Sequence, residues 1–185
     1  TLIRDSEGKP RAFLAFVRDI SHFRNIQRDL EARRRQAEAL FHISDASRHD
    51  IDLETFFRMV VDEVAKASDF PIVSLERYDA QRQVMIFLAN RGFPADGAEC
   101  PHEVPLDRTI SGSVALTGLP QIIPDARTRP DYADESLRRL RVVTFICVPI
   151  MMNGRVWGTF ALAHDRPEPI DDFLVQWLEA LARCL

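Results

Sequence analysis

Proline and glycine are spread unevenly along this chain, and their distribution limits where long helices can form. Residues 11–70 contain neither amino acid, whereas residues 71–185 hold ten of the eleven prolines and six of the seven glycines. Proline lacks the amide hydrogen that a helix needs, and glycine weakens helices. The first region can therefore hold long helices, and the second must turn often.

Length and composition indicate one globular domain with an additional segment. The 185 residues are 46% hydrophobic and 28% charged, a balance typical of globular proteins, with a net charge of -4. A weakly acidic chain is not suited to neutralising nucleic-acid phosphates, and no apolar run approaches the ~20 residues that span a bilayer. We therefore expect neither nucleic acid nor membrane as a partner. The chain starts at Thr1 rather than Met, so we expect a piece of a longer protein.

The three cysteines, Cys100, Cys147 and Cys184, indicate a reducing compartment. Their odd number and irregular spacing argue against a disulfide framework, which predicts a cytoplasmic location. They are not arranged in the short pairs that zinc sites use, so no metal site is expected. Cys147 lies in an apolar run and Cys184 on an amphipathic stretch, so both are predicted to be small buried hydrophobic residues.

The N-terminal part is predicted to contain a hairpin and a long helix. Strands at residues 2–4 and 11–20 flank a turn-forming segment, and residues 21–48 are charged and favour a helix. One heptad position of this helix holds Phe23, Leu30, Ala37 and Ser44, and the other holds Ile26, Arg33, Leu40 and Ser47. This is a weak coiled-coil seam, which favours a parallel dimer stalk over a helix packed on its own domain.

The next segment is predicted to contain a capped helix and a hairpin. Asp52 is placed as an N-cap, with Ile51 and Phe56 as a hydrophobic staple, before an apolar helical stripe that ends near Ser68. Strands at residues 71–79 and 83–91 are joined by a short link and predict an antiparallel hairpin.

The remainder alternates loops, short helices and strands. A loop is expected at residues 92–107, a helix from Thr109 to Gly118, a strand at 121–123 and helical turns within 130–141. An apolar strand at 142–150 leads through Asn153-Gly154 into a strand at 155–164. A helix follows from Asp171 or Asp172. The order predicts an α+β fold, with an antiparallel sheet of about five to six strands flanked by helices.

Two stretches of the sequence resemble GAF domains. The segment GSVALTGLPQIIPD at residues 112–125 resembles the GAF pattern of a helix ending in Thr-Gly, a proline, a short strand and an aspartate. The segments VPI at 148–150, NG at 153–154 and VWGTFAL at 156–162 resemble the closing hairpin of that family. The resemblance covers residues 36–185 and implies a GAF-like domain there.

The front of the chain resembles a second family. Residues 5–8 and 13–20, which end in RDIS at 18–21, resemble the last two strands of a PAS domain and the start of its signalling helix. The two resemblances imply a PAS-like end at 1–20, a helical coiled-coil linker at 21–48 and a GAF-like domain at 36–185. They imply that the chain comes from a longer bacterial signalling protein. The favoured candidate for this parent protein is a sensor histidine kinase, and the second candidate is a diguanylate cyclase.

The GAF resemblance implies a pocket for a small molecule on the concave face of the sheet. Such pockets are apolar with a few placed polar groups. The expected wall residues are Phe145 and Cys147, or their alternates Thr144 and Ile146, and the expected polar anchors are Arg91, Asp125 and Tyr132. Each anchor also has a local alternative, in which Asp125 caps its loop, Tyr132 covers the core edge and Arg91 stays at the rim.

The resemblance also allows some ligand classes to be set aside. The Asn-Lys…Phe…Asp-Glu motif of cyclic-nucleotide-binding GAF domains is missing, and residues 134–141 lack the Cys-His pair of bilin-binding ones. One GAF-fold group reduces free methionine sulfoxide, but this thiol chemistry needs an activated thiolate and a resolving partner. We therefore expect a non-catalytic sensory module with an unknown ligand, dimeric through the linker and the C-terminal helix. The alternatives are a structural relay without ligand and, less favoured, a methionine sulfoxide reductase.

Overall fold

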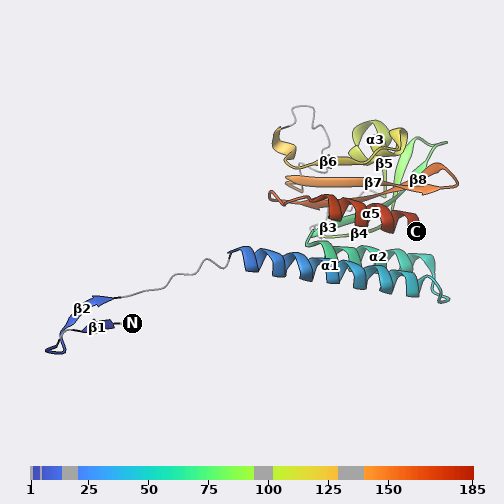
Figure 1. The fold of residues 1–185 in the computed structure, drawn as a ribbon. Coiled ribbons are helices and arrows are strands. Elements are labelled where there is room, and N and C mark those ends of the chain that lie inside the picture. Colours follow the sequence, from blue (N-terminus) through green and yellow to red (C-terminus); the bar gives the residue numbers. More distant parts are fainter. Residues whose placement is uncertain (1, 5, 14–20, 94–101, 129–139) are drawn as a thin grey trace. The chain divides into compact units, whose positions relative to one another are not determined.

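The computed structural model describes residues 2–4, 6–13, 21–93, 102–128 and 140–185 (Figure 1). The chain forms two compact units, residues 1–33 and 34–185, and the boundary falls within helix α1 (Ser21–Ala46). In the first unit, β1 (Leu2–Arg4) and β2 (Pro10–Phe13) pair antiparallel. This confirms a hairpin in this segment, while residues 14–20 of the predicted second strand lie outside the described residues.

The second unit contains a six-stranded antiparallel sheet in the order β5-β4-β3-β8-β7-β6. Its strands are β3 (Ile72–Asp79), β4 (Val84–Arg91), β5 (Glu103–Pro105), β6 (Gln121–Ile123), β7 (Thr144–Met152) and β8 (Arg155–His164). The predicted α+β fold is confirmed. Strand β5, however, lies within residues predicted as loop, because three residues are too few to show a strand period.

The two hairpins of the sheet close as the local sequence predicts. In the β3–β4 link, the carboxylate of Asp79 accepts hydrogen bonds from the backbone amides of Gln81 and Arg82 at 3.1 and 3.0 Å. In the β7–β8 turn, Asn153 and Gly154 both adopt positive φ, 52° and 74°. A two-residue hairpin turn of type I′ requires positive φ at both central residues, and Asn-Gly adopts this conformation with little strain.

The helices begin at side-chain caps. Asp52 accepts from the Thr55 amide at the start of α2 (Leu53–Ser68), and Asp171 accepts from the Leu174 amide before α5 (Asp172–Cys184). Helix α3 (Ile110–Thr117) is capped by Thr109 and ends at Gly118, whose φ of 67° is left-handed. These caps confirm the predicted helix boundaries, because capping depends on residues only a few positions apart.

One face of the sheet is covered by α2, α5 and the second half of α1 (Figure 1). The indole Nε1 of Trp177 on α5 donates to the backbone carbonyl of Gln36 on α1 at 3.0 Å, and Arg35 pairs with Asp69 at 2.5 Å. The prediction that Cys184 is buried was wrong, because it lies in the last turn of α5 at the edge of the apolar stripe and is exposed.

The opposite face is covered by α3 and by the 3-10 turns η1 (Leu106–Arg108) and η2 (Ala126–Thr128), among the described residues. Alternation along β7 sends Phe145 and Cys147 to this side, whereas Ile146 and Val148 enter the core on the helical side. The apolar residues under α3 form two separate small clusters. Polar side chains lie on this face of β3, and they define the candidate site.

Candidate small-molecule site

A buried carboxylate lies on the α3 side of the sheet, at the middle of β3. The period of two along the strand brings Ile72, Ser74 and Glu76 to this side, while Val73 and Leu75 enter the opposite core. Glu76 is only 4% exposed. Its Oε1 accepts a hydrogen bond from Ser74 Oγ at 2.8 Å and another from Ser111 Oγ at 3.2 Å. Since Ser111 belongs to the first turn of α3, the carboxylate holds that helix on the sheet.

Two glycines allow the close approach that this arrangement requires. A Cβ at Gly112, in the first turn of α3, would lie 2.1 Å from the backbone oxygen of Leu106. A Cβ at Gly158 on β8 would lie 2.2 Å from the backbone oxygen of Glu76. Both distances are far inside van der Waals contact, so any side chain would push these backbones apart. The glycines therefore fix the position of α3 and the spacing of the central strands.

Cys147 extends the polar cluster beneath α3. It is fully buried, and its Sγ lies 3.9 Å from Ser111 Oγ as a hydrogen-bond donor. Burial, and next the charge of Glu76, raise the pKa of the Cys147 thiol far above its ordinary value, although the neighbouring Ser111 hydroxyl offsets part of this effect. Because the thiolate is the reactive form, this cysteine is a poor nucleophile at neutral pH.

A small inner cavity of about 40 Å³ opens over this cluster. Its wall is formed by Ile72, Ser74, Glu76, Phe87, Phe93, Val104, Thr109, Ser111, Leu140, Phe145, Ala161, Leu162 and Ala163. Among the described lining residues, Glu76 is the only ionisable one. The wall is thus mostly apolar with a few convergent polar groups, which is the usual composition of a small-molecule site.

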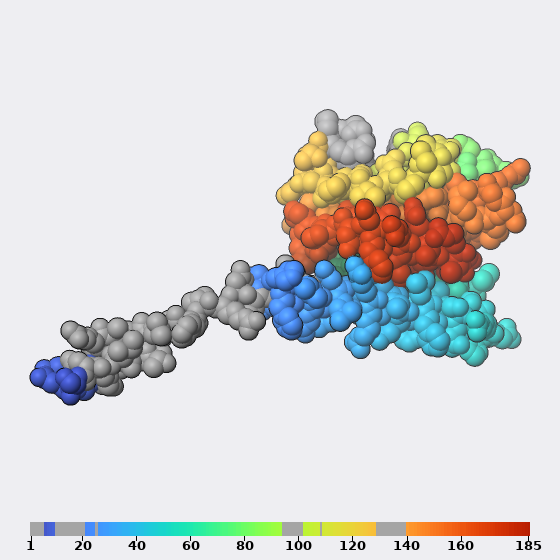
Figure 2. All heavy atoms as spheres, viewed as in Figure 1, coloured from blue at the N-terminus to red at the C-terminus, as the bar shows by residue number. Residues whose placement is uncertain are grey.

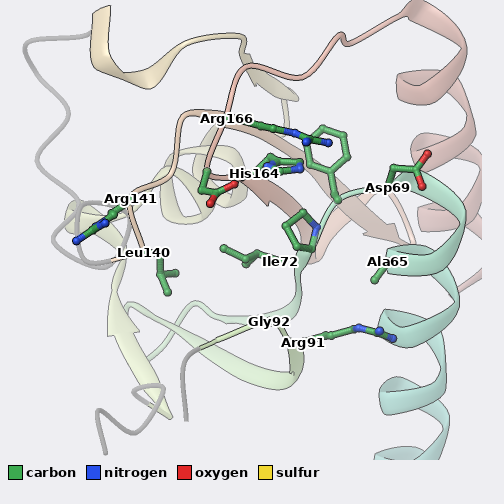
Figure 3. Close-up of a pocket in the computed structure, with 12 residues that line it drawn as sticks. Ala65, Asp69, Ile72, Arg91, Gly92, Leu140, Arg141, His164 and Arg166 are labelled. Atoms are coloured by element: carbon green, nitrogen blue, oxygen red, sulfur yellow. Dashed lines mark hydrogen bonds and ion pairs between the residues drawn. The ribbon is translucent and has the colours of Figure 1, made fainter. Parts of the chain in front are cut away.

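A larger outer cavity of about 670 Å³ lies at the end of the sheet where β3 begins and β4 and β8 end (Figure 3). Ile72 and Leu140 line both cavities, so the two adjoin. The outer cavity has more ionisable side chains, which are those of Asp69, Arg91, Arg141, His164, Asp165 and Arg166.

Most of the charged groups around the outer cavity already have partners. Arg91 reaches toward α2 and pairs with Asp62 at 2.9 Å (Figure 3). Arg166 pairs with Glu168 at 3.3 Å, and the Nδ1 of His164 lies 2.9 Å from Asp165. Asp69 binds Arg35. These pairs hold the rim together locally, and the charges do not converge on one point.

The four described residues among the five predicted from the sequence do not meet at one place. Phe145 lines the inner cavity and Cys147 lies beneath it, whereas Arg91 lines the outer cavity. Asp125 binds its own loop, with both carboxylate oxygens on the Arg127 guanidinium at 2.7 and 2.8 Å. That ion pair also lowers the pKa of Asp125 below its ordinary value. Tyr132 lies outside the described residues.

The alternative wall residues Thr144 and Ile146 lie outside the inner cavity, and three residues of the polar cluster were not predicted from the sequence. Thr144 Oγ1 is bound to the loop carbonyls of Pro124 and Arg166, and Ile146 is part of the helical-side core. Ser74, Glu76 and Ser111 were not predicted. The signal that could have found the first two was present in the strand IVSLERYD at 72–79, where alternate positions of an otherwise apolar strand are polar.

The described residues show neither a metal-ligand cluster nor a membrane-spanning helix. No three or more His, Cys, Asp or Glu side chains there are grouped so that they could hold a metal ion. None of the helices in the described part of the chain has the length and apolar character needed to cross a membrane.

The fold and the roofed cavity define a small α+β domain with a pocket on one face of its sheet, and comparison with known proteins gives its family. Residues 50–183 match the GAF domain family. The chain therefore belongs to the GAF domain family, whose members are sensory and regulatory modules that bind small molecules. No protein of curated function matches the sequence significantly.

Solved structures share the fold at low sequence identity. A GAF domain from an Acinetobacter phosphoenolpyruvate-protein phosphotransferase is 18% identical with a TM-score of 0.68, over 80% of this chain and 88% of that one. Free methionine-R-sulfoxide reductase from Neisseria meningitidis, in complex with its substrate, is 19% identical with a TM-score of 0.67, over 80% and 84%. The phycocyanobilin-bound GAF domain of a cyanobacterial phytochrome is 15% identical with a TM-score of 0.65, over 80% and 90%.

Proposed function

We propose that this chain is a non-catalytic sensory module of a cytoplasmic, bacterial multidomain signalling protein, with a sensor histidine kinase as the favoured parent. In this proposal residues 1–20 are the end of a PAS-like domain, residues 21–48 are a helical linker, and residues 36–185 are the sensing domain. A small molecule binds in the inner cavity. The observation that carries the proposal is the buried cluster of Ser74, Glu76 and Ser111 in an otherwise apolar wall.

A buried carboxylate is costly to retain unless it has a role. Removing a carboxylate from water costs several kcal/mol, which hydrogen bonds only partly offset. An apolar residue at the position of Glu76 would avoid this cost. The cluster thus supports selection for binding rather than for stability alone, and it gives a ligand polar groups that can fix its orientation.

The hydrogen bond between Ser111 and Glu76 offers a path from ligand to helix. A ligand that competes for the Glu76 carboxylate changes the attachment of α3 to the sheet. On the other face, Trp177 joins the C-terminal helix α5 to the second half of α1, and Figure 2 shows the red surface of α5 beside the lighter blue surface of that half of the helix. The ligand can shift the helices only by its differential affinity for the two arrangements.

Dimerisation through α1 is supported by a second apolar stripe. Phe23, Ile26 and Leu30 are 68%, 53% and 67% exposed, and Phe41 is 69% exposed. At 100° per residue these positions share one side of a helix, nearly opposite the side that buries Ala39 and Ile43. The occupant proposed for this stripe is the same helix of a second, parallel copy.

The dimer is tested by the association constant from sedimentation equilibrium. Leu30→Ser should weaken association, whereas Arg33→Leu should tighten it by making the seam apolar. Arg24→Ser, at an exposed position away from the stripe, serves as the control. Unchanged association in both Leu30→Ser and Arg33→Leu would contradict the stalk.

The placement of the described cysteines supports a non-catalytic role. Cys147 is buried with a raised pKa, and Cys184 lies on α5, which packs on the other face of the sheet. The direct assay is turnover of free methionine sulfoxide with a thiol reductant. We expect none, and turnover above the rate without protein would favour the reductase instead.

The small inner cavity favours a second candidate, a structural relay that binds no ligand. A volume of about 40 Å³ holds only a few water molecules until the site opens. Native mass spectrometry of the purified chain beside the denatured protein separates the candidates. An extra mass that is bound non-covalently and lost on denaturation supports ligand sensing. A native mass equal to that of the polypeptide alone favours the structural relay.

A further inference from the structure

Helix α1 carries a buried glutamine on the side where its other buried residues are apolar. Ala39 and Ile43 are 2% and 1% exposed and belong to the core of the helical face. Gln36 lies three and seven residues before them, on the same side of the helix, and is 5% exposed. Residues 34–37, here called the Gln36 turn, are thus a polar start to the packed part of α1.

Two side chains of the Gln36 turn bury a polar atom that has no hydrogen-bond partner among the described residues. These atoms are the Oε1 of Gln36 and the Nε of Arg35. A buried polar atom without a partner has lost its hydrogen bonds to water and gained none in exchange. Both atoms therefore destabilise the position that the Gln36 turn occupies in the structure.

Helix α5 contributes the opposing contact. The indole Nε1 of Trp177, which is 5% exposed, donates to the backbone carbonyl of Gln36 at 3.0 Å. The ion pair between Arg35 and Asp69 adds little, because both side chains are partly exposed. One hydrogen bond and one unpartnered buried atom are of the same order in free energy, so the packed position of this turn is held close to balance.

We propose that the Gln36 turn is a conformational switch with two arrangements. In the closed arrangement, which the structure shows, Trp177 is bonded to the Gln36 carbonyl. In the open arrangement the turn separates from α5, and water binds the side-chain amide of Gln36. Ala39 and Ile43 stay in the core in both arrangements, so the rest of the packed part of α1 remains in place.

The position of the switch gives it a regulatory role. The Gln36 turn follows directly on the boundary between the two compact units, residues 1–33 and 34–185. Opening it changes how α1 leaves the sensing domain, and a movement of α5 changes how often it opens. The inference goes beyond the proposed function, because it requires no ligand in the inner cavity.

The test is amide hydrogen exchange, followed residue by residue in the ¹⁵N-labelled chain by nuclear magnetic resonance. Gln36→Leu keeps a similar size and removes the unpartnered amide oxygen, so it should favour the closed arrangement. We expect exchange at residues 35–40 to slow by at least ~10-fold, which corresponds to about 1.4 kcal/mol. The amides of residues 41–46 of the same helix should change less.

Two further variants separate the switch from a general change in stability. Trp177→Phe removes the donor and should speed exchange at residues 35–40 more than elsewhere in the domain. Gln176→Leu is the matched control, because it makes the same chemical change at an exposed position of α5 and should leave these rates unchanged. Circular dichroism checks the fold. If Gln36→Leu does not fold, the local effect of Trp177→Phe still decides.

Two results would overturn the inference. Unchanged or faster exchange at residues 35–40 in Gln36→Leu would show that the Gln36 side chain has a partner in the closed arrangement, such as a buried water molecule. Equal acceleration across the whole domain in Trp177→Phe would show that this contact only supports global stability.

Discussion

The two faces of the central sheet are built from the same strands but have different interiors. On the helical face, β3, β7 and β8 contribute to one continuous core with α1, α2 and α5. On the α3 face, the neighbouring residues of the same strands divide into two small apolar clusters, with a buried carboxylate and the inner cavity. Alternation along a strand therefore gives each face its own composition.

This difference indicates a division of labour. A continuous apolar core supplies most of the stabilisation, because burial of apolar area is the dominant favourable contribution to folding. A face with small clusters and polar groups can rearrange at lower cost, as ligand-binding regions usually do. The α3 face can thus respond to a ligand while the helical face keeps the domain folded.

The largest expected effect comes from removing one phenylalanine from each face. Phe160 is fully buried in the helical-face core, and Phe145 lines the inner cavity. Phe160→Ala should lower the free energy of unfolding by about 3–5 kcal/mol, and Phe145→Ala by at least ~1 kcal/mol less, because its site already borders empty space. Urea unfolding measures both. An equal loss, or a larger one for Phe145→Ala, would contradict the division of labour.

The alkylation rates of Cys147 and Cys184 allow the two faces of the sheet to be compared. Cys147 lies buried under α3 with a raised pKa, and Cys184 is exposed on α5. Alkylation by iodoacetamide should modify Cys147 at least ~100-fold more slowly than Cys184, because it needs both opening of the α3 face and deprotonation. Peptide mass spectrometry gives the rates, and denaturant should abolish the difference. If the alkylation rates of the two cysteines in the folded protein differ by less than ~10-fold, the α3 face opens too often for Cys147 to count as protected.

A smaller effect is expected for the link between α1 and α5. Trp177→Phe removes the hydrogen bond to the Gln36 carbonyl and should cost about 1 kcal/mol of unfolding free energy. Trp157→Phe is the matched control, since Trp157 packs near Phe57 and is only partly buried. Chemical denaturation compares the two variants. If they lose equal stability, the hydrogen bond does not contribute to joining the helices.

The smallest effect concerns a surface cluster on the helical face. Hydrogen bonds from Lys66, and then from His42, lower the pKa of Glu63 below its ordinary value of 4.5. A lowered pKa in the folded state means that Glu63 stabilises the protein above pH 4.5, and that this contribution is lost as the pH falls through the folded-state pKa. Glu63→Gln should therefore cost a few tenths of a kcal/mol at neutral pH and nothing in acid. A difference that grows on acidification, in urea unfolding at several pH values, would show the opposite sign.

The candidate site was only partly predictable from the sequence. The sequence left open whether Phe145 and Cys147 or their neighbours Thr144 and Ile146 line the pocket, and the structure places Phe145 and Cys147 on the α3 face and Ile146 in the opposite core. Asp125 was assigned a possible ligand role, but its carboxylate binds Arg127 two residues away. Glu76 was missed, because its significance depends on Ser111, which lies 35 residues further along the chain.

The sequence by itself determined the elements whose physics is local. The helix caps at Asp52, Thr109 and Asp171 and the Asn153-Gly154 turn act within a few residues, so their patterns are visible in one dimension. The tertiary structure decided that β5 adds to the sheet, that Trp177 meets Gln36 and that a serine of α3 reaches the carboxylate of β3. These contacts join segments far apart in the chain, and they form only when packing of the whole domain compensates for the entropy of closing the intervening loops.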